Sequence, residues 1–216
     1  MNIEEYFRLR GISMRVIVGL EAHDGSGKST TAVEISKLFK GSVFFTNEEI
    51  KDRRSEIYKS KTLAHQDKMD SIEKTYEAEK VEFTERIKSD FVVLDRTWYS
   101  HTVEENVMDI LDRKSNRTFP SKKIPHDVLK PDFIFQIIIP EEERKKRVEE
   151  RGEVLTPRDI RLNDDDTYRE MLENERERFG CSKLRLRLRD PKVCALRAAQ
   201  ILLGNASIPP LRINLE

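Results

Sequence analysis

The chain has few cysteines, no long hydrophobic segment and no stretch resembling a signal peptide. Its two cysteines, Cys181 and Cys194, fit neither a metal-binding spacing nor a disulfide framework. This usage indicates a reducing, intracellular setting, and we expect a cytoplasmic protein. No apolar run approaches the ~18 residues of a membrane span, and residues 1–13 lack the apolar core of a signal peptide. We therefore expect neither a disulfide-stapled secreted domain nor a membrane partner.

An excess of charge of either sign is also missing. Lys and Arg total 40, Asp and Glu total 40, and the formal net charge is zero. This balance argues against a surface that coats nucleic acid, which is usually strongly basic. The 216 residues suffice for one domain with a buried core, and they contain no internal repeat or low-complexity linker.

A loop of small residues, placed between an apolar run and a helical pattern, is the most informative feature that is present. The apolar run is Val16 to Leu20, and the loop reads His23-Asp24-Gly25-Ser26-Gly27-Lys28-Ser29-Thr30. Glycines let the backbone fold around an anion, and the N-terminus of the following helix adds its dipole. The order strand, loop and helix predicts a phosphate loop for a nucleoside triphosphate. Lys28 would reach the β- and γ-phosphates, and Ser29 would ligate Mg²⁺.

The strict form of this motif has glycine where this chain has Ala22. Looser forms accept alanine, and the phosphate-facing residues Gly25 to Ser29 are intact. The alternative interpretation is a glycine turn between a core strand and a helix, with Lys28 solvated. The flanking strand and helix favour the phosphate loop.

Short apolar runs alternate with helical patterns along the chain. Expected strands are 15–20, 42–46, 91–95, 132–139 and 183–189, and expected helices are 28–40, 64–88, 100–112, 141–151, 166–179 and 190–203. Nearly continuous apolar strands are typical of a parallel sheet covered on both faces, whereas the alternation in 183–189 predicts an edge strand. The pattern predicts an α/β fold whose ligand lies beyond the carboxyl ends of the strands.

The strand 91–95 ends in a carboxylate followed by a guanidinium. Asp95 at this tip, facing the phosphate loop, would hold Mg²⁺ or its water shell, and Arg96 would clamp a phosphate. The alternative is a local Asp–Arg pair. The loop upstream favours the functional interpretation.

Together these segments resemble the thymidylate kinase family of P-loop nucleoside monophosphate kinases, over Met14 to Leu203. The segments similar to the family's motifs are Glu21 to Thr30, Asp95-Arg96-Thr97 with Ser100, Pro131-Asp132, Arg151-Gly152-Glu153 and Thr75 to Lys80. The resemblance implies a three-layer P-loop kinase fold with a mostly parallel five-stranded sheet. It implies an extension over 1–13, a kinase domain over 14–204 with a lid at about 151–166, and a tail over 205–216.

The resemblance also implies residue roles, with ATP and Mg²⁺ as cofactors. Asp24 would face the acceptor sugar, or else cap the loop, and Arg96 would bridge the donor and acceptor phosphates. Some family members place a catalytic arginine at the position of Gly25, whereas others take their cations from the lid. The lid candidates here are Arg151, Arg158 and Arg161. For each of them a solvated surface charge is an equally supported interpretation. Asn163 to Asp166 is expected to be a flexible part of that lid.

The departures from the family cluster on the acceptor side. The family's phosphate-binding Arg after the second strand is replaced by Asn47, and its Arg after the aromatic segment by Lys80. The residues expected near the acceptor are Asp24, Asn47, Tyr76, Lys80, Arg96, Ser100 and Glu104. ATP-dependent kinase chemistry is therefore better supported than thymidylate as the substrate.

We predict a phosphotransferase that moves the ATP γ-phosphate to a nucleoside monophosphate or a related small acceptor. The alternatives are a kinase for a non-nucleotide hydroxyl or a polynucleotide 5′ end, and an ATP-binding regulator with a degraded acceptor site. A GTPase is disfavoured because the chain has no Asn-Lys-x-Asp tetrapeptide. The resemblance further implies a homodimer, packed through helix 64–88 or helix 100–112.

Overall fold

The computed structural model describes most of the chain. The described residues are 15–45, 52, 56–57, 59, 65–111, 128–152, 155, 157–185 and 190–204. Within these ranges the side chains of residues 65–70, 72–73, 76, 101, 109, 157–158 and 182–185 are outside the description, and they include Tyr76 and Arg158. Asn47 and Glu153 lie outside the described residues altogether.

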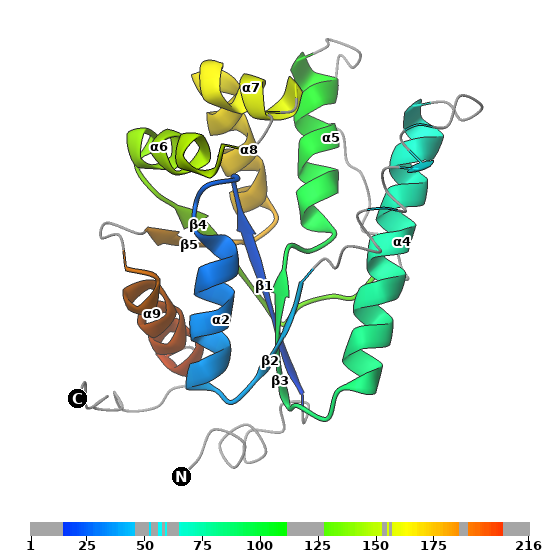
Figure 1. Cartoon of the computed structure of the whole chain (residues 1–216). Coiled ribbons are helices and arrows are strands. Elements are labelled where there is room, and N and C mark those ends of the chain that lie inside the picture. The colour runs from blue at the N-terminus through cyan, green and yellow to red at the C-terminus, as the bar shows by residue number, and fades with distance from the viewer. Residues whose placement is uncertain are drawn as a thin grey trace.

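A parallel sheet forms the centre of the molecule (Figure 1). Its strands are β1 (Val16–Ala22), β2 (Ser42–Phe44), β3 (Phe91–Asp95), β4 (Phe133–Ile138) and β5 (Ser182–Arg185). Their order is β2-β3-β1-β4-β5, and every neighbouring pair is parallel. The strand with alternating hydrophobicity lies at an edge, as its pattern predicts.

Helices cover both faces of this sheet, which gives three layers (Figure 1). They are α2 (Lys28–Leu38), α4 (His65–Arg86), α5 (Tyr99–Leu111), α6 (Glu141–Arg151), α7 (Pro157–Asp164), α8 (Asp166–Arg178) and α9 (Pro191–Gly204). Helices α2 and α9 lie on one face, and α4, α5 and α8 on the other, while α6 and α7 lie above the loop that follows β1. None of the helices in the described ranges is long and apolar enough to cross a membrane.

The main core lies between the sheet and the pair α2–α9. Alternate residues of β1, namely Val16, Val18 and Leu20, pack with Ile35 of α2 and Ala198 of α9, and none of these five is more than 1% exposed. Burial of this apolar surface is the main stabilising contribution to the fold. The intervening residues of β1 face the opposite helices, and one of them is the carboxylate Glu21, which is fully buried.

Within the described residues, α7 is a helix that the sequence did not predict. Asn163 and Asp164, expected in a flexible segment, are the last residues of α7, and Asp165 caps α8 by accepting a 2.9 Å hydrogen bond from the backbone N–H of Tyr168. These residues are therefore helical or cap a helix, and the expectation that they belong to a mobile segment stays a prediction. A run of Asp suggested a loop, but Asp is a favoured N-cap residue, and here it separates two helices.

Register places the ends of the central strands side by side. Leu20 of β1 is opposite Asp95 of β3, so the loop that leaves β1 begins beside the carboxylate that ends β3. This edge is where parallel sheets bind their ligands.

Candidate nucleotide site

The loop from His23 to Gly27 has the backbone geometry of an anion-binding loop. Gly25 has φ of +87° and Gly27 has φ of +78°, values that residues with a side chain rarely adopt. A Cβ atom added to Gly25 would lie 2.7 Å from Cγ2 of Val148 and 2.8 Å from the carbonyl oxygen of Arg144. Helix α6 thus packs on the loop closely enough that glycine is required at position 25.

Ala22, which departs from the strict motif, causes no conflict in this fold. It is the last residue of β1, lies opposite Ile137 of β4, and its methyl group is fully buried in the main core. The chain does not begin to turn until after this residue, so position 22 does not need the conformational freedom of glycine.

Lys28, Ser29 and Asp95 meet at the mouth of the loop. The Lys28 amine forms an ion pair with Oδ1 of Asp95, and the Ser29 hydroxyl donates a 2.5 Å hydrogen bond to Oδ2 of the same carboxylate. Both charged side chains are about nine-tenths buried. Burial, followed by the positive charge of Arg96, lowers the pKa of Lys28 to about 7.

The same residues supply donors that suit a small divalent cation. A hydroxyl and a carboxylate oxygen are hard ligands, and Mg²⁺ in nucleotide sites takes one or two such groups together with phosphates and water. Among the described residues no group of three or more His, Cys, Asp or Glu side chains forms a separate metal site. Ser29 and Asp95 therefore fit an ion that arrives with a nucleotide, and they do not form a complete protein cage.

Arg96 occupies a backbone conformation that is rare for a residue with a side chain. Its φ is +79°, and its N–H donates a 3.1 Å hydrogen bond to the carbonyl of Leu20. Its guanidinium forms an ion pair with the carboxylate of Asp24, and both groups are partly exposed. Residues held in such conformations cluster at functional sites, where surrounding contacts maintain them.

Glu21 provides one of those surrounding contacts. Its Oε1 accepts hydrogen bonds from the backbone N–H of Thr97 at 2.8 Å and from the Thr97 hydroxyl at 2.7 Å, and its Oε2 accepts one from the Ser100 hydroxyl. Ser100, expected near the acceptor, therefore donates to a buried carboxylate in this structure. The buried Glu21 fixes the turn that follows Arg96.

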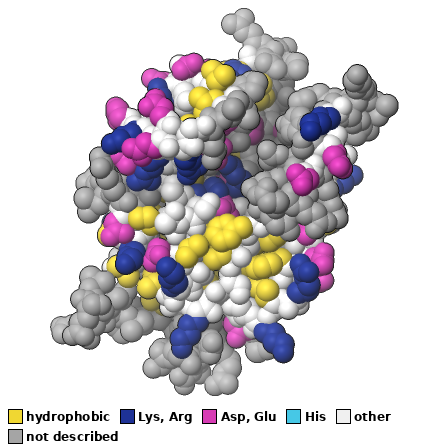
Figure 2. All heavy atoms as spheres, viewed as in Figure 1, with side chains coloured by type: hydrophobic (Ala, Val, Ile, Leu, Met, Phe, Trp, Pro, Cys, Tyr) yellow, Lys and Arg dark blue, Asp and Glu magenta, His cyan; other side chains and the backbone are white. Residues whose placement is uncertain are grey.

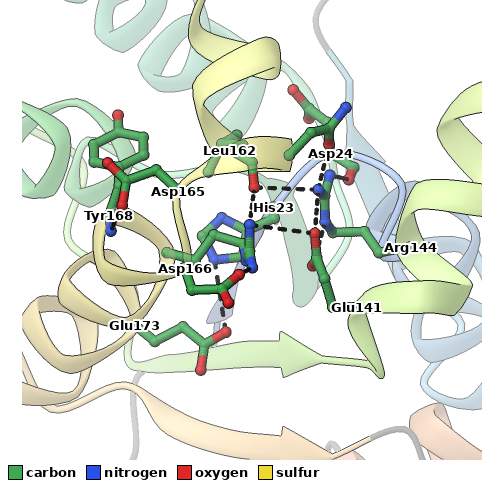
Figure 3. Close-up of polar contacts among 11 residues, drawn as sticks. His23, Asp24, Glu141, Arg144, Leu162, Asp165, Asp166, Tyr168 and Glu173 are labelled. Carbon is green, nitrogen blue, oxygen red and sulfur yellow. Dashed lines mark hydrogen bonds and ion pairs between the residues drawn. The ribbon is translucent and has the colours of Figure 1, made fainter.

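His23 is a buried loop residue that lies against α8. It is 5% exposed, and its Nε2 lies 3.6 Å from Oε1 of Glu173 in α8 (Figure 3). Burial, assisted by the positive charge of Arg176, lowers the pKa of His23 to about 4. The imidazole is therefore neutral near pH 7 and acts as a packing group between the loop and α8.

The three lid arginines expected from the sequence have different surroundings. Arg151, the last residue of α6, is exposed, and its charge contributes to lowering the pKa of Lys28. Arg161 of α7 lies 4.7 Å from the ring centroid of Tyr168 and 3.6 Å from the carboxylate of Asp165. Arg158 belongs to α7, with its side chain outside the described set.

Two predicted acceptor residues are engaged within the protein. Lys80 of α4 is 3% exposed and forms a 2.5 Å ion pair with Glu77 of the same helix. Glu104 of α5 accepts a 3.3 Å hydrogen bond from the hydroxyl of Tyr168, which joins α5 to α8. The Lys80 pair lies within α4, whereas the Glu104 bond joins two helices. Neither contact tests the roles expected from the sequence.

Sequence reasoning missed the two arginines of α6 that lie next to the loop. Arg144 donates a 3.1 Å hydrogen bond to the carbonyl of Asp24, and a guanidinium nitrogen of Arg147 lies 3.1 Å from the place of a Cβ on Gly27. A signal was present, because Arg144, Arg147, Val148 and Arg151 share one face of the predicted helix 141–151. Figure 2 shows Lys and Arg side chains gathered in a recess below the α6–α7 region.

No family model matches the chain, and no curated protein sequence matches it. Solved structures of nucleotide kinases share the α/β fold of this chain, a parallel sheet flanked by helices. M. mycoides deoxyadenosine kinase with its products dCMP and dCDP bound is similar, with a TM-score of 0.56 and 17% identity over 88% of this chain and 100% of that chain. The same enzyme with dATP bound gives a TM-score of 0.54 and 15% identity, over 87% of this chain and 100% of that chain.

Thymidylate kinase from Candida albicans is similar to the same extent. Its TM-score is 0.56 and its identity 17%, over 88% of this chain and 92% of that chain. The structure thus confirms, at the level of the fold, the resemblance that the sequence motifs carry.

Proposed function

We propose that this protein is an ATP-dependent phosphotransferase that moves the γ-phosphate of ATP to a nucleoside, a nucleoside monophosphate or a related small acceptor. The observation that carries the proposal is the meeting of Lys28, Ser29 and Asp95 at the mouth of the phosphate loop. Phosphoryl transfer needs positioning and positive charge more than it needs a nucleophilic side chain, and this site offers both.

The donor half of the site follows from its charges. Lys28 in the free protein is paired with Asp95 and carries a lowered pKa. A triphosphate would replace the carboxylate as its partner and raise the pKa again, because an adjacent anion favours the charged amine. Asp95 and Ser29 would then be free to hold Mg²⁺, which neutralises the phosphate oxygens when bound.

The acceptor half is assigned to the pair Asp24 and Arg96. Both side chains are partly exposed at the edge of the sheet where the donor loop lies, so a substrate can reach them. A guanidinium suits a phosphate and a carboxylate suits a sugar hydroxyl. On this proposal the acceptor opens the ion pair, Arg96 turns to the transferred phosphate, and Asp24 receives the hydroxyl.

Additional positive charge would come from the end of α6. Arg151 is exposed, and its positive charge acts on Lys28, so on this proposal it would turn to the donor phosphates. Arg161 would first have to leave Tyr168 and Asp165. We therefore rank Arg151 first among the lid cations.

A coupled assay of ADP release tests the proposal. Purified protein with ATP and Mg²⁺ is supplied with each of a panel of nucleosides and nucleoside monophosphates, and Lys28→Met is the inactive control. Turnover on at least one acceptor, abolished by Lys28→Met, is the expected result. Tight ATP binding without transfer to any panel member would instead identify an ATP-binding regulator.

A further inference from the structure

Arg144 is a buried arginine that joins three elements around the phosphate loop. It lies in α6, and its side chain is 3% exposed. Arginine is almost never buried to this extent unless its donors are paired. The partners of Arg144 therefore indicate what the residue is for.

The guanidinium is occupied by groups of the protein itself (Figure 3). Its Nε and one terminal nitrogen donate to the two carboxylate oxygens of Glu141 at 2.8 and 2.7 Å. The same terminal nitrogen donates to Oδ1 of Asn163 at 2.5 Å, and the other donates to the carbonyl of Asp24 at 3.1 Å. A guanidinium engaged in this way positions other groups and is not offered to a phosphate.

The bond to Asp24 sets the orientation of one peptide in the loop. A trans peptide is planar, so its carbonyl and its N–H point in opposite directions. Holding the Asp24 carbonyl toward α6 therefore directs the Gly25 N–H away from α6. A peptide beside glycine rotates easily when nothing holds it, and an anion-binding loop needs its N–H groups fixed toward the anion.

The other bonds of Arg144 hold the end of α7. Asn163 is one residue before the end of that helix, and the carbonyl of Leu162 also faces Arg144 at 3.4 Å. Arg169 of α8 donates to the same carbonyl at 2.5 Å and lies 3.5 Å from Glu141. Two cations thus fix the C-terminal end of α7, where the helix dipole favours them.

We propose that Arg144 is a positioning residue that couples docking of α7 to the nucleotide-binding shape of the phosphate loop. The effect on nucleotide rests on the proposed function. One guanidinium holds both the Asp24 peptide and the end of α7. A position of the guanidinium that favours its bond to Asn163 therefore also favours its bond to the Asp24 carbonyl. Coupling of this kind is reciprocal, so nucleotide in the loop would stabilise docked α7, and docked α7 would raise the affinity for nucleotide.

Amide hydrogen exchange tests this coupling directly. Exchange is followed in peptides covering 22–30 and 157–164, with and without ATP and Mg²⁺, in the wild type, Arg144→Lys and Asn163→Ala. Lysine keeps the charge beside Glu141 but cannot hold several separated acceptors in one plane. Lys146→Met is the matched control, because Lys146 is an exposed cation of the same helix that pairs with Glu150.

In Arg144→Lys the backbone amides of both peptides should exchange faster than in the wild type. The ATP-dependent protection of 157–164 should be lost, and a fluorescent ATP analogue should bind about tenfold more weakly. Asn163→Ala should lose the same ATP-dependent protection of 157–164. Its affinity for the ATP analogue should fall less than that of Arg144→Lys. Lys146→Met should match the wild type. If Arg144→Lys fails to fold by circular dichroism, Asn163→Ala decides the question.

Unchanged protection of 157–164 in the folded Arg144→Lys variant, or in Asn163→Ala, would overturn the coupling. A wild type that binds no ATP would overturn the proposed function instead. In that case the free-state exchange of 22–30 still decides whether Arg144 holds the loop, since faster exchange in Arg144→Lys supports the assignment and equal exchange overturns it.

Discussion

Glu21 and Thr97 are 76 residues apart in the chain, and one carboxylate oxygen of Glu21 accepts both the backbone N–H and the hydroxyl of Thr97. This pair joins the second-last residue of β1 to the residue after Arg96. It gives a physical reason for a left-handed conformation at Arg96, because the N–H that follows is held by a fixed, buried acceptor.

Glu21→Gln should therefore impair both stability and catalysis. The amide keeps the shape of the carboxylate but replaces one acceptor with a donor that faces other donors. We expect a loss of about 1–3 kcal/mol in the free energy of unfolding, from groups left unpaired in the interior. Turnover should fall as well because Arg96 loses its support. Urea denaturation and the ADP-release assay measure the two effects, and Glu34→Gln, a partly exposed carboxylate paired with Lys37, is the control. Full turnover in Glu21→Gln would show that Arg96 does not depend on it.

Asp95→Asn should reduce Mg²⁺-dependent turnover by about 100-fold or more, the scale of losing one preorganised charge contact. It also leaves the buried Lys28 without its carboxylate, which destabilises the fold. The double variant Lys28→Met/Asp95→Asn should therefore be more stable than Asp95→Asn alone, although it is inactive. Thermal unfolding of the four proteins in this cycle measures the coupling. Additive stability changes would show that the ion pair contributes nothing.

His23 should make the fold sensitive to mild acid. Its pKa is lowered to about 4 by burial in the folded protein, from an ordinary value of 6.5. The unfolded chain therefore binds the proton first as pH falls, and stability contributed by neutral His23 is lost between pH 6.5 and pH 4, by up to about 3 kcal/mol. The groups facing the ring are Glu173, Arg176 and Arg144. His23→Gln should flatten this part of the stability profile, which urea denaturation at several pH values measures. If the free energy of unfolding falls with pH as steeply in His23→Gln as in the wild type, the acid sensitivity comes from other groups.

Gly25→Ala should be more damaging than Gly152→Ala. Both glycines have positive φ, but a Cβ at Gly152 meets nothing within 4 Å, whereas at Gly25 it meets Val148 and the backbone of Arg144. The control variant isolates the conformational cost, about 1–2 kcal/mol for a residue with a side chain. Gly25→Ala adds the clash and should abolish binding of an ATP analogue. Equal unfolding free energies for the two variants would mean that α6 yields to the added methyl group.

The order and type of most elements could be predicted from the sequence because their patterns are local. β3 and α6 have the predicted boundaries, and the alternating strand lies at the sheet edge. Helix α7 was missed because a short, charged helix between Pro157 and Asp164 has a weak local signal and depends on Arg144 and Arg169 for its last carbonyls. The phosphate loop was predicted in the same local way, from its glycines, and the predicted strand and helix do flank it.

The sequence by itself determined the order of groups in the loop, because the glycines, Lys28 and Ser29 are neighbours in the chain, and their spacing predicts a phosphate loop. Only the tertiary structure decided which distant groups support that loop. Arg144 lies 120 residues from the Asp24 carbonyl it holds, and Glu21 lies far from Thr97. Contacts of this kind depend on strand register and on how α6 packs over the sheet edge, and no periodicity within either segment encodes them.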